Sequence, residues 1–201
     1  NSDIDFTSIS SVINSFKQYP IKDFFIHKKN AEDEVNFYTL SKDINIIPYL
    51  NNKATISLLW DICRIPDFQK FSTDSHINFL KNIFLTLVKN DGILPESWLE
   101  NGVFRLENYK GGIEELSIKI ATIRTWTYIA NQSNWIKNYQ FWQEKTQDIE
   151  NNLSDYLHTS LTNRFVDFSA SYFVDTKMRG EKPIITVDEN KSIKLNGQNY
   201  G

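Results

Sequence analysis

The run Arg124 to Tyr128 contains three side chains that suit single-stranded RNA. A guanidinium pairs with phosphate, and aromatic rings stack on bases for about 1–3 kcal/mol per base. Residues two apart point to different sides of a helix, so Arg124, Trp126 and Tyr128 cannot share one surface. Because tryptophan is highly buried on average, a packing role is favoured, in which Trp126 belongs to the core and Arg124 caps a buried carboxylate.

A second candidate group lies between residues 153 and 164. Asp155 and His158 are three residues apart, which on a helix allows a hydrogen bond that favours the charged imidazole. No nucleophile accompanies this pair and no further metal ligand is in register. A hydrogen-bonded histidine in a polar network between helices is therefore favoured over an acid–base or metal site. Arg164 suits an RNA phosphate and a neighbouring carboxylate equally well.

The densest basic cluster in the first third of the chain is Lys22, Lys28 and Lys29. The cluster could contact RNA, although lysines on a loop are usually only solvated. The candidate RNA-binding residues are therefore Arg124, Trp126, Tyr128, His158, Arg164, Lys28 and Lys29.

The sequence predicts no catalytic residue and no metal site of its own. It contains no P-loop, no H-E-x-x-H, no C-x-x-C, no G-x-S-x-G and no G-x-G-x-x-G. Acidic pairs such as Glu114-Glu115 fall among lysines at helical spacing, which is typical of a solvated face. We expect this chain by itself to be no enzyme and to bind no cofactor.

The composition narrows the class of protein. Hydrophobic residues make up 40% and charged residues 23% of the 201 residues, which excludes overall disorder. The net charge of −3 argues against a bulk polyanion binder. A single cysteine, no secretion signal and no long apolar run indicate a cytoplasmic protein without a membrane span. Because the chain begins at Asn1 rather than methionine, we expect a fragment or a processed product.

Helical patterns fill the chain as far as residue 178. Apolar residues recur every three or four positions, and caps, prolines and glycines separate the segments, with Asp3 or Asp5 as the first N-cap. The expected helices cover residues 5–16, 30–42, 54–65, 76–88, 96–104, 113–130 and 141–178. The last would span more than about 50 Å at about 1.5 Å per residue, and we expect shorter helices to pack against it as a spine.

The pattern changes after Gly180. Pro183 to Val187 and Ser192 to Leu195 alternate like strands, and a turn at 188–191 joins them, which predicts a β-hairpin. The predicted fold is mainly α, an irregular multi-helix bundle around a long spine helix with a C-terminal β-hairpin. We expect a helical domain over 1–180, with a sub-boundary near 105–112 left open. Residues 181–201 would form the hairpin or begin a truncated small domain.

Three blocks of sequence resemble a known family. They are LWDICRIPDF at 59–68, IATIRTWTYI at 120–129 and, after Trp142-Gln143, IENNLSDYLHTSLTNRFVD at 149–167. In this order they resemble the C-terminal region of bacterial, mainly alphaproteobacterial, relatives of the mitochondrial degradosome RNA helicase. That family consists of superfamily 2, DExH-type, ATP-dependent helicases. The resemblance covers roughly residues 59–167.

The resemblance implies that this chain is the helical accessory domain that follows two RecA-like motor domains. The ATP site, its Mg²⁺ and the DExH box would lie in those motor domains, since none of their motifs occurs here. The resemblance also implies that the domain binds or steers the unwound single strand of RNA and braces the motor. Single-stranded RNA and the motor domains are then the expected partners.

Two alternatives stay open. A helical protein-interaction module could dock a ribonuclease or another partner without touching RNA, and an exposed apolar patch of several hundred Å² would favour it. An unrelated small helical enzyme would need a pocket with convergent ionisable groups of perturbed pKa, which the sequence does not offer. A positive groove lined by arginine and aromatic residues would favour RNA binding.

Overall fold

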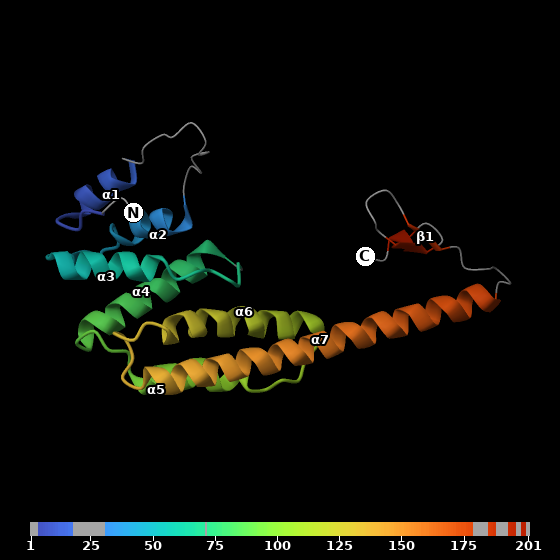
Figure 1. Ribbon diagram of the computed structural model, residues 1–201. Helices are drawn as coiled ribbons and strands as arrows, with labels where there is room; N and C mark the ends of the chain where they lie inside the picture. The colour runs from blue at the N-terminus through green and yellow to red at the C-terminus, as the bar shows by residue number, and fades with distance from the viewer. Residues whose placement is uncertain are drawn as a thin grey trace. The chain divides into compact units, whose positions relative to one another are not determined.

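The computed structural model describes residues 4–17, 31–70, 72–178, 185–187, 193–195 and 198–199, and side chains as far as residue 167. The described part is mainly helical (Figure 1). The chain forms two compact units, residues 1–154 and 155–201. The boundary between the units falls within one long helix, so that helix belongs to both.

The helices lie where the sequence predicts helices, with shifted ends. They are α1 (Ile9–Lys17), α2 (Glu32–Leu40), α3 (Lys53–Cys63), α4 (Thr73–Lys89), α5 (Glu96–Val103), α6 (Ile113–Ala130) and α7 (Tyr139–Met178), with short 3-10 helices η1 (Ile47–Tyr49) and η2 (Phe104–Leu106). The bounds of α6 are the predicted ones.

Side-chain caps explain where these helices begin. The N–H of Ser11 donates to Ser8 Oγ at 3.0 Å, so α1 begins after Ser8. The predicted cap Asp5 instead accepts from the N–H of Thr7 at 3.0 Å in a preceding turn. At α4, the predicted capping segment supplies Ser72, which accepts from the N–H of Ser75 at 3.1 Å. Each cap satisfies one of the N–H groups that a helix start leaves free.

Two aromatic clusters lie at the centre of the first unit. Ring centroids within each cluster are 4.8–6.0 Å apart, a spacing that favours tilted and edge-to-face pairs. The clusters are Phe16, Phe37 and Trp60 between α1, α2 and α3, and Phe79, Trp98 and Trp126 between α4, α5 and α6.

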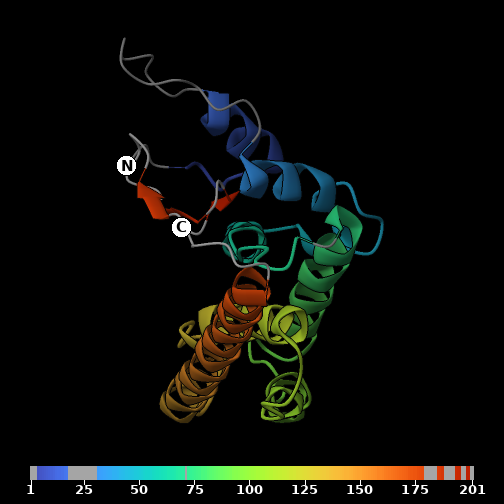
Figure 2. The ribbon, with the colours of Figure 1, turned by 90° about the vertical axis from the view of Figure 1, so that its right-hand side faces the viewer.

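Helix α6 is buried on more than one side. It lies beside the first part of α7 (Figures 1 and 2), and the ion pair of Arg124 with Glu150 joins the two helices. Ile120, Ile123 and Trp126 are all at most 7% exposed, whereas Ile118 is 42% exposed. Burial on more than one side is typical of a central helix.

Helix α7 reaches the core only as far as Leu153. Trp142, Thr146, Ile149 and Leu153 are buried. Later apolar positions of the same helix, Tyr156, Leu161 and Phe165, are about half exposed. The prediction that the whole helix is a spine is therefore wrong for these later turns, because their apolar side chains face solvent rather than shorter helices.

The second unit contains the rest of α7 and three short strands, β1 (Ile185–Val187), β2 (Ile193–Leu195) and β3 (Gln198–Asn199). β1 and β3 each pair antiparallel with β2. The turn expected at 188–191 lies outside the described residues. The hairpin and the domain boundaries near 105–112 and 180 stay predictions.

Candidate functional site

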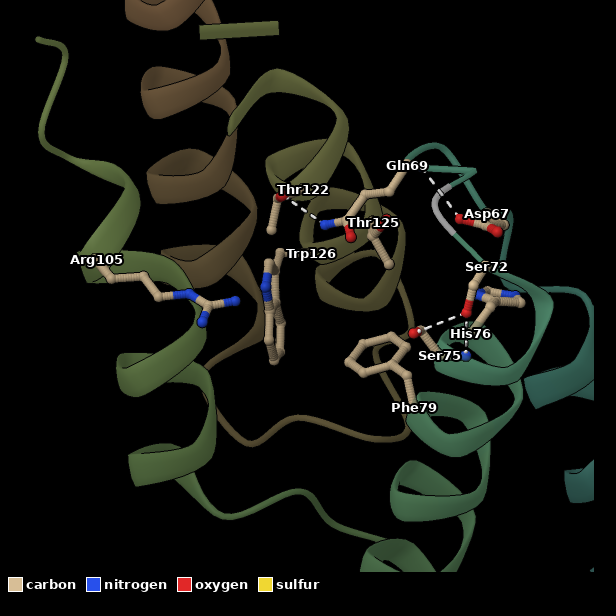
Figure 3. Close-up of a pocket in the computed structure, with 10 residues that line it drawn as sticks. All are labelled: Asp67, Gln69, Ser72, Ser75, His76, Phe79, Arg105, Thr122, Thr125 and Trp126. Carbon is tan, nitrogen blue, oxygen red and sulfur yellow. Dashed lines mark hydrogen bonds between the residues drawn. The ribbon is translucent and has the colours of Figure 1, made fainter. Parts of the chain in front are cut away.

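A small pocket lies between α4, η2, α6 and the connection from α3 to α4 (Figure 3). Its volume is about 160 Å³, well below the roughly 300–1,000 Å³ of sites for drug-sized ligands. The pocket can therefore hold one small chemical group rather than a whole cofactor. Its lining residues are Asp67, Gln69, Ser72, Ser75, His76, Phe79, Arg105, Thr122, Thr125 and Trp126.

A tight turn at residues 67–70 builds one wall of the pocket. Asp67 Oδ1 accepts from the N–H groups of Gln69 at 3.2 Å and Lys70 at 3.0 Å, and Lys70 adopts a left-handed φ of 50°. The turn directs the Gln69 side chain toward α6, where its Nε2 donates to Thr122 Oγ1 at 2.5 Å. This hydrogen bond ties the α3–α4 connection to α6.

The first turn of α4 supplies hydroxyl groups and an imidazole. Ser72 Oγ and Ser75 Oγ are 3.0 Å apart. His76 Nε2 lies 3.1 Å from the carbonyl oxygen of Ile65. A carbonyl only accepts, so Nε2 carries the proton. Among the described residues, no hydrogen bond joins the His76 ring to the hydroxyl group of Ser72 or Ser75. The group is therefore not the nucleophile–base pair that a hydrolase needs.

The opposite end of the pocket carries Arg105 and Trp126. Trp126 is only 5% exposed, and its indole N–H makes no hydrogen bond within the described part of the chain. The exposed Arg105 makes no ion pair there either. In Figure 3 the guanidinium of Arg105 and the nitrogen edge of the Trp126 ring point toward one another. Two donors thus converge at this end of the pocket.

The predicted residue Arg124 is engaged in an ion pair. Its Nε donates to Glu150 Oε1 at 3.0 Å, and Thr127 Oγ1 lies 3.3 Å from Oε2 of the same carboxylate. The side chain of Glu150 is 19% exposed and that of Arg124 is 51% exposed. Arg124 therefore caps a largely buried carboxylate, while part of its guanidinium stays open to solvent. Tyr128 is half-buried.

Among the other predicted residues that the structure describes, neither His158 nor Arg164 lines the pocket. His158 and Arg164 are exposed on α7. The hydrogen bond expected between Asp155 and His158 does not form in this part of the structure, and the prediction of a packed histidine is wrong because the ring is exposed. Lys28 and Lys29, like Lys22, lie outside the described residues.

Sequence reasoning missed most of the pocket. Of the candidate RNA-binding residues, only Trp126 lines it. Asp67 belongs to the first block of the family resemblance, which could have drawn attention to it. Gln69 and His76 have no recognisable spacing to α6. Arg105 stands in a short 3-10 helix with no periodic pattern, so no sequence signal marks it.

The other pockets and the single cysteine offer few groups for catalysis or binding. A pocket of about 510 Å³ beside the start of α5 includes Lys89 and Lys137, and one of about 390 Å³ adjoins the Asp67 turn. Burial, with a smaller effect of Asp33, raises the pKa of the Cys63 thiol, which is typical of an inert thiol. The described residues contain no cluster of His, Cys, Asp or Glu that could hold a metal.

Comparisons with known proteins identify no relative. No family model, no curated protein and no solved structure matches the chain. In the part of the chain that the structure describes, no helix combines the length and the apolar character needed to cross a membrane.

Proposed function

We propose that this chain is a helical accessory domain of a cytoplasmic ATP-dependent RNA helicase. Its role is to bind or guide the unwound single strand of RNA and to brace the motor domains. ATP hydrolysis belongs to those motor domains, and the accessory domain performs no chemistry itself.

The observation that carries the proposal is a set of contacts between the three blocks of the family resemblance. The first block ends at Phe68, and the next residue, Gln69, donates to Thr122 of the second block. Arg124 of the second block pairs with Glu150 of the third. Segments that are far apart in sequence thus both contact α6, which supports a common structural unit over three chance matches.

Exposed arginine side chains support contact with RNA. Arg164 is exposed and Arg124 is half exposed, so both guanidinium groups can approach phosphate without disrupting the core. Because the net charge of the chain is −3, attraction for RNA must come from local positive groups rather than from the charge of the whole chain.

The test is the affinity of the 201-residue chain for labelled single-stranded RNA, measured by fluorescence anisotropy at two salt concentrations. We expect binding that weakens with salt, because each phosphate contact releases counterions. Arg164→Ala should weaken binding and reduce the salt dependence. Folded protein that binds no RNA even at low salt would contradict the proposal.

Arg124 needs a matched control, because Arg124→Ala also leaves the Glu150 carboxylate without its cation. Glu150→Gln breaks the ion pair but keeps the guanidinium. If Arg124 contacts RNA, Arg124→Ala weakens binding while Glu150→Gln leaves binding unchanged or strengthens it. Equal loss in both variants would assign Arg124 to packing alone.

The later turns of α7 favour a second candidate function, docking of a protein partner. Leu161, Phe165 and Val166 are 48–56% exposed on successive turns, and such apolar side chains often mark an interaction surface. If these turns dock a protein partner, the double variant Leu161→Asp with Phe165→Asp would abolish binding to a purified ribonuclease partner and leave RNA affinity unchanged.

A further inference from the structure

We propose that the end of the pocket between Arg105 and Trp126 is an oxyanion site that binds a phosphate group. The site itself is inferred from the geometry of the pocket. That RNA supplies the phosphate rests on the function proposed above.

The first argument is the indole N–H of Trp126. The residue is 95% buried, it lines the pocket, and its N–H has no acceptor among the described residues. A buried donor without a partner costs about 1–3 kcal/mol, and native structures contain few of them. The N–H lies at the pocket and faces another donor, Arg105, so this end of the pocket suits an acceptor that a ligand supplies.

The second argument is the guanidinium of Arg105, which points to the same volume (Figure 3). Arginine only donates, and its planar group suits phosphate and carboxylate oxygens. None of the ion pairs in the described part of the chain involves Arg105. A water molecule could satisfy the indole N–H, whereas an anion would in addition pair with the guanidinium of Arg105.

The third argument concerns size and the opposite charge in the pocket. Asp67 lies at the far end in Figure 3, where its carboxylate is engaged by the turn at 67–70. An anion is therefore confined to the end with Arg105 and Trp126. The volume of about 160 Å³ admits a phosphate group but leaves the remainder of a nucleotide or strand outside.

The test follows the indole N–H signals of the 201-residue chain by ¹⁵N–¹H NMR during addition of sodium phosphate at constant ionic strength. The chain has five tryptophans, and Trp126→Phe assigns the signal in question. We expect the Trp126 signal alone to move, with saturation in the millimolar range. No movement at tens of millimolar phosphate, or the same movement with sodium chloride, would overturn the proposal.

Variants that each remove one positive charge test the second donor, the guanidinium of Arg105. Arg105 is exposed, so Arg105→Met should leave the fold intact and weaken phosphate binding about tenfold or more, as expected for a hydrogen bond to a charged group. Lys110→Met removes an exposed positive charge that does not line the pocket, and it should leave binding unchanged. Equal weakening in both variants, or an equal response of the Trp126 signal to acetate, would overturn the assignment of a phosphate site.

Short oligouridylate distinguishes the source of the phosphate. If RNA supplies it, the oligonucleotide moves the same Trp126 signal at lower concentration than inorganic phosphate does. Movement with phosphate but no RNA binding supports the site and refutes the RNA role. RNA binding that leaves the Trp126 signal and the Arg105→Met variant unaffected overturns the site and keeps the RNA role.

Discussion

Trp126 combines packing with a hydrogen-bond donor that has no acceptor among the described residues. Its ring packs against Phe79 and Trp98, with centroids 6.0 and 5.1 Å away, while the N–H lies at the edge of a pocket. Gly102 permits this arrangement, because a Cβ at that position would overlap the Trp126 ring. A residue that sequence reasoning treats as either core or ligand-binding can therefore be both.

Gly102→Ala should lower the free energy of unfolding by about 1–3 kcal/mol, since the added methyl group must displace a ring packed in the core. Urea denaturation measures the loss. Gly112→Ser is the control, because nothing lies within 4 Å of its Cβ and serine is a good N-cap for α6. The control should change stability by only a few tenths of a kcal/mol. Equal effects in both variants would contradict the predicted overlap.

Asp43 should make the stability depend on pH. Burial raises its pKa, but hydrogen bonds from Lys81, 2.7 Å away, and from Asn45 outweigh burial and hold the pKa below its ordinary value of 3.8. A depressed folded-state pKa stabilises the fold above 3.8, and the contribution is lost as pH falls through the lower value. Asp43→Asn should therefore cost about 1 kcal/mol at neutral pH, and progressively less below pH 3.8.

Thermal unfolding of both proteins between neutral and acid pH checks this dependence. Asp61→Asn is a control for which we expect the opposite pH dependence, because burial raises the pKa of Asp61 above 3.8 despite Arg64 nearby. The fold disfavours the ionised carboxylate of Asp61. The effect of Asp61→Asn on the free energy of unfolding should therefore become more favourable as pH rises through 3.8. A constant difference between Asp43→Asn and the parent chain at all pH values would refute the role of the carboxylate.

At the scale of single elements, α7 shows that the spacing of apolar residues predicts a helix but not how much of it is buried. Apolar residues repeat along the helix from Trp142 to Phe165, and the sequence predicts one continuous buried face. Burial ends at Leu153 in the described part of the helix. Periodicity records which side of a helix is apolar, but it does not record whether another element covers that side.

The same substitution at two positions of α7 should have different effects. Leu153 is fully buried, and Leu153→Ala should cost about 2–5 kcal/mol through lost contacts and a cavity. Leu161 is 48% exposed, and Leu161→Ala should change stability by no more than about 0.5 kcal/mol. Chemical denaturation of both variants measures the contrast. A large loss at Leu161 would show that this turn is covered by another surface.

At the scale of the whole molecule, the chain divides within a helix rather than at a linker. The first unit ends at Ser154, directly after the last buried apolar residue that the described part contains. A unit that holds all of these core residues should fold without the remainder, because tertiary packing supplies most of the stability of its helices.

A chain shortened to residues 1–160 should therefore unfold cooperatively, with a melting temperature within a few degrees of that of the full chain. Circular dichroism at 222 nm during heating measures both transitions. A shortened chain that lacks a cooperative transition would show that residues 161–201 belong to the folding unit. Phosphate titration of the shortened chain would then test whether the pocket stays intact.

Local sequence patterns predict the helical class of this chain and the order and approximate ends of its helices. These features depend on local signals, such as the spacing of apolar residues, the Ser72 cap and the uninterrupted run in α7. The sequence also favoured a carboxylate partner for Arg124, and the structure identifies this partner as Glu150.

Only the tertiary structure decided which side chains meet. The pocket joins Asp67, Arg105 and Trp126 from three separate segments, and no spacing in the sequence relates them. Tertiary packing also buries Trp126 without an acceptor for its N–H in the described part of the chain, and it leaves the later turns of α7 exposed. Burial and partnership depend on contacts between elements, and these arise from packing that local sequence patterns do not encode.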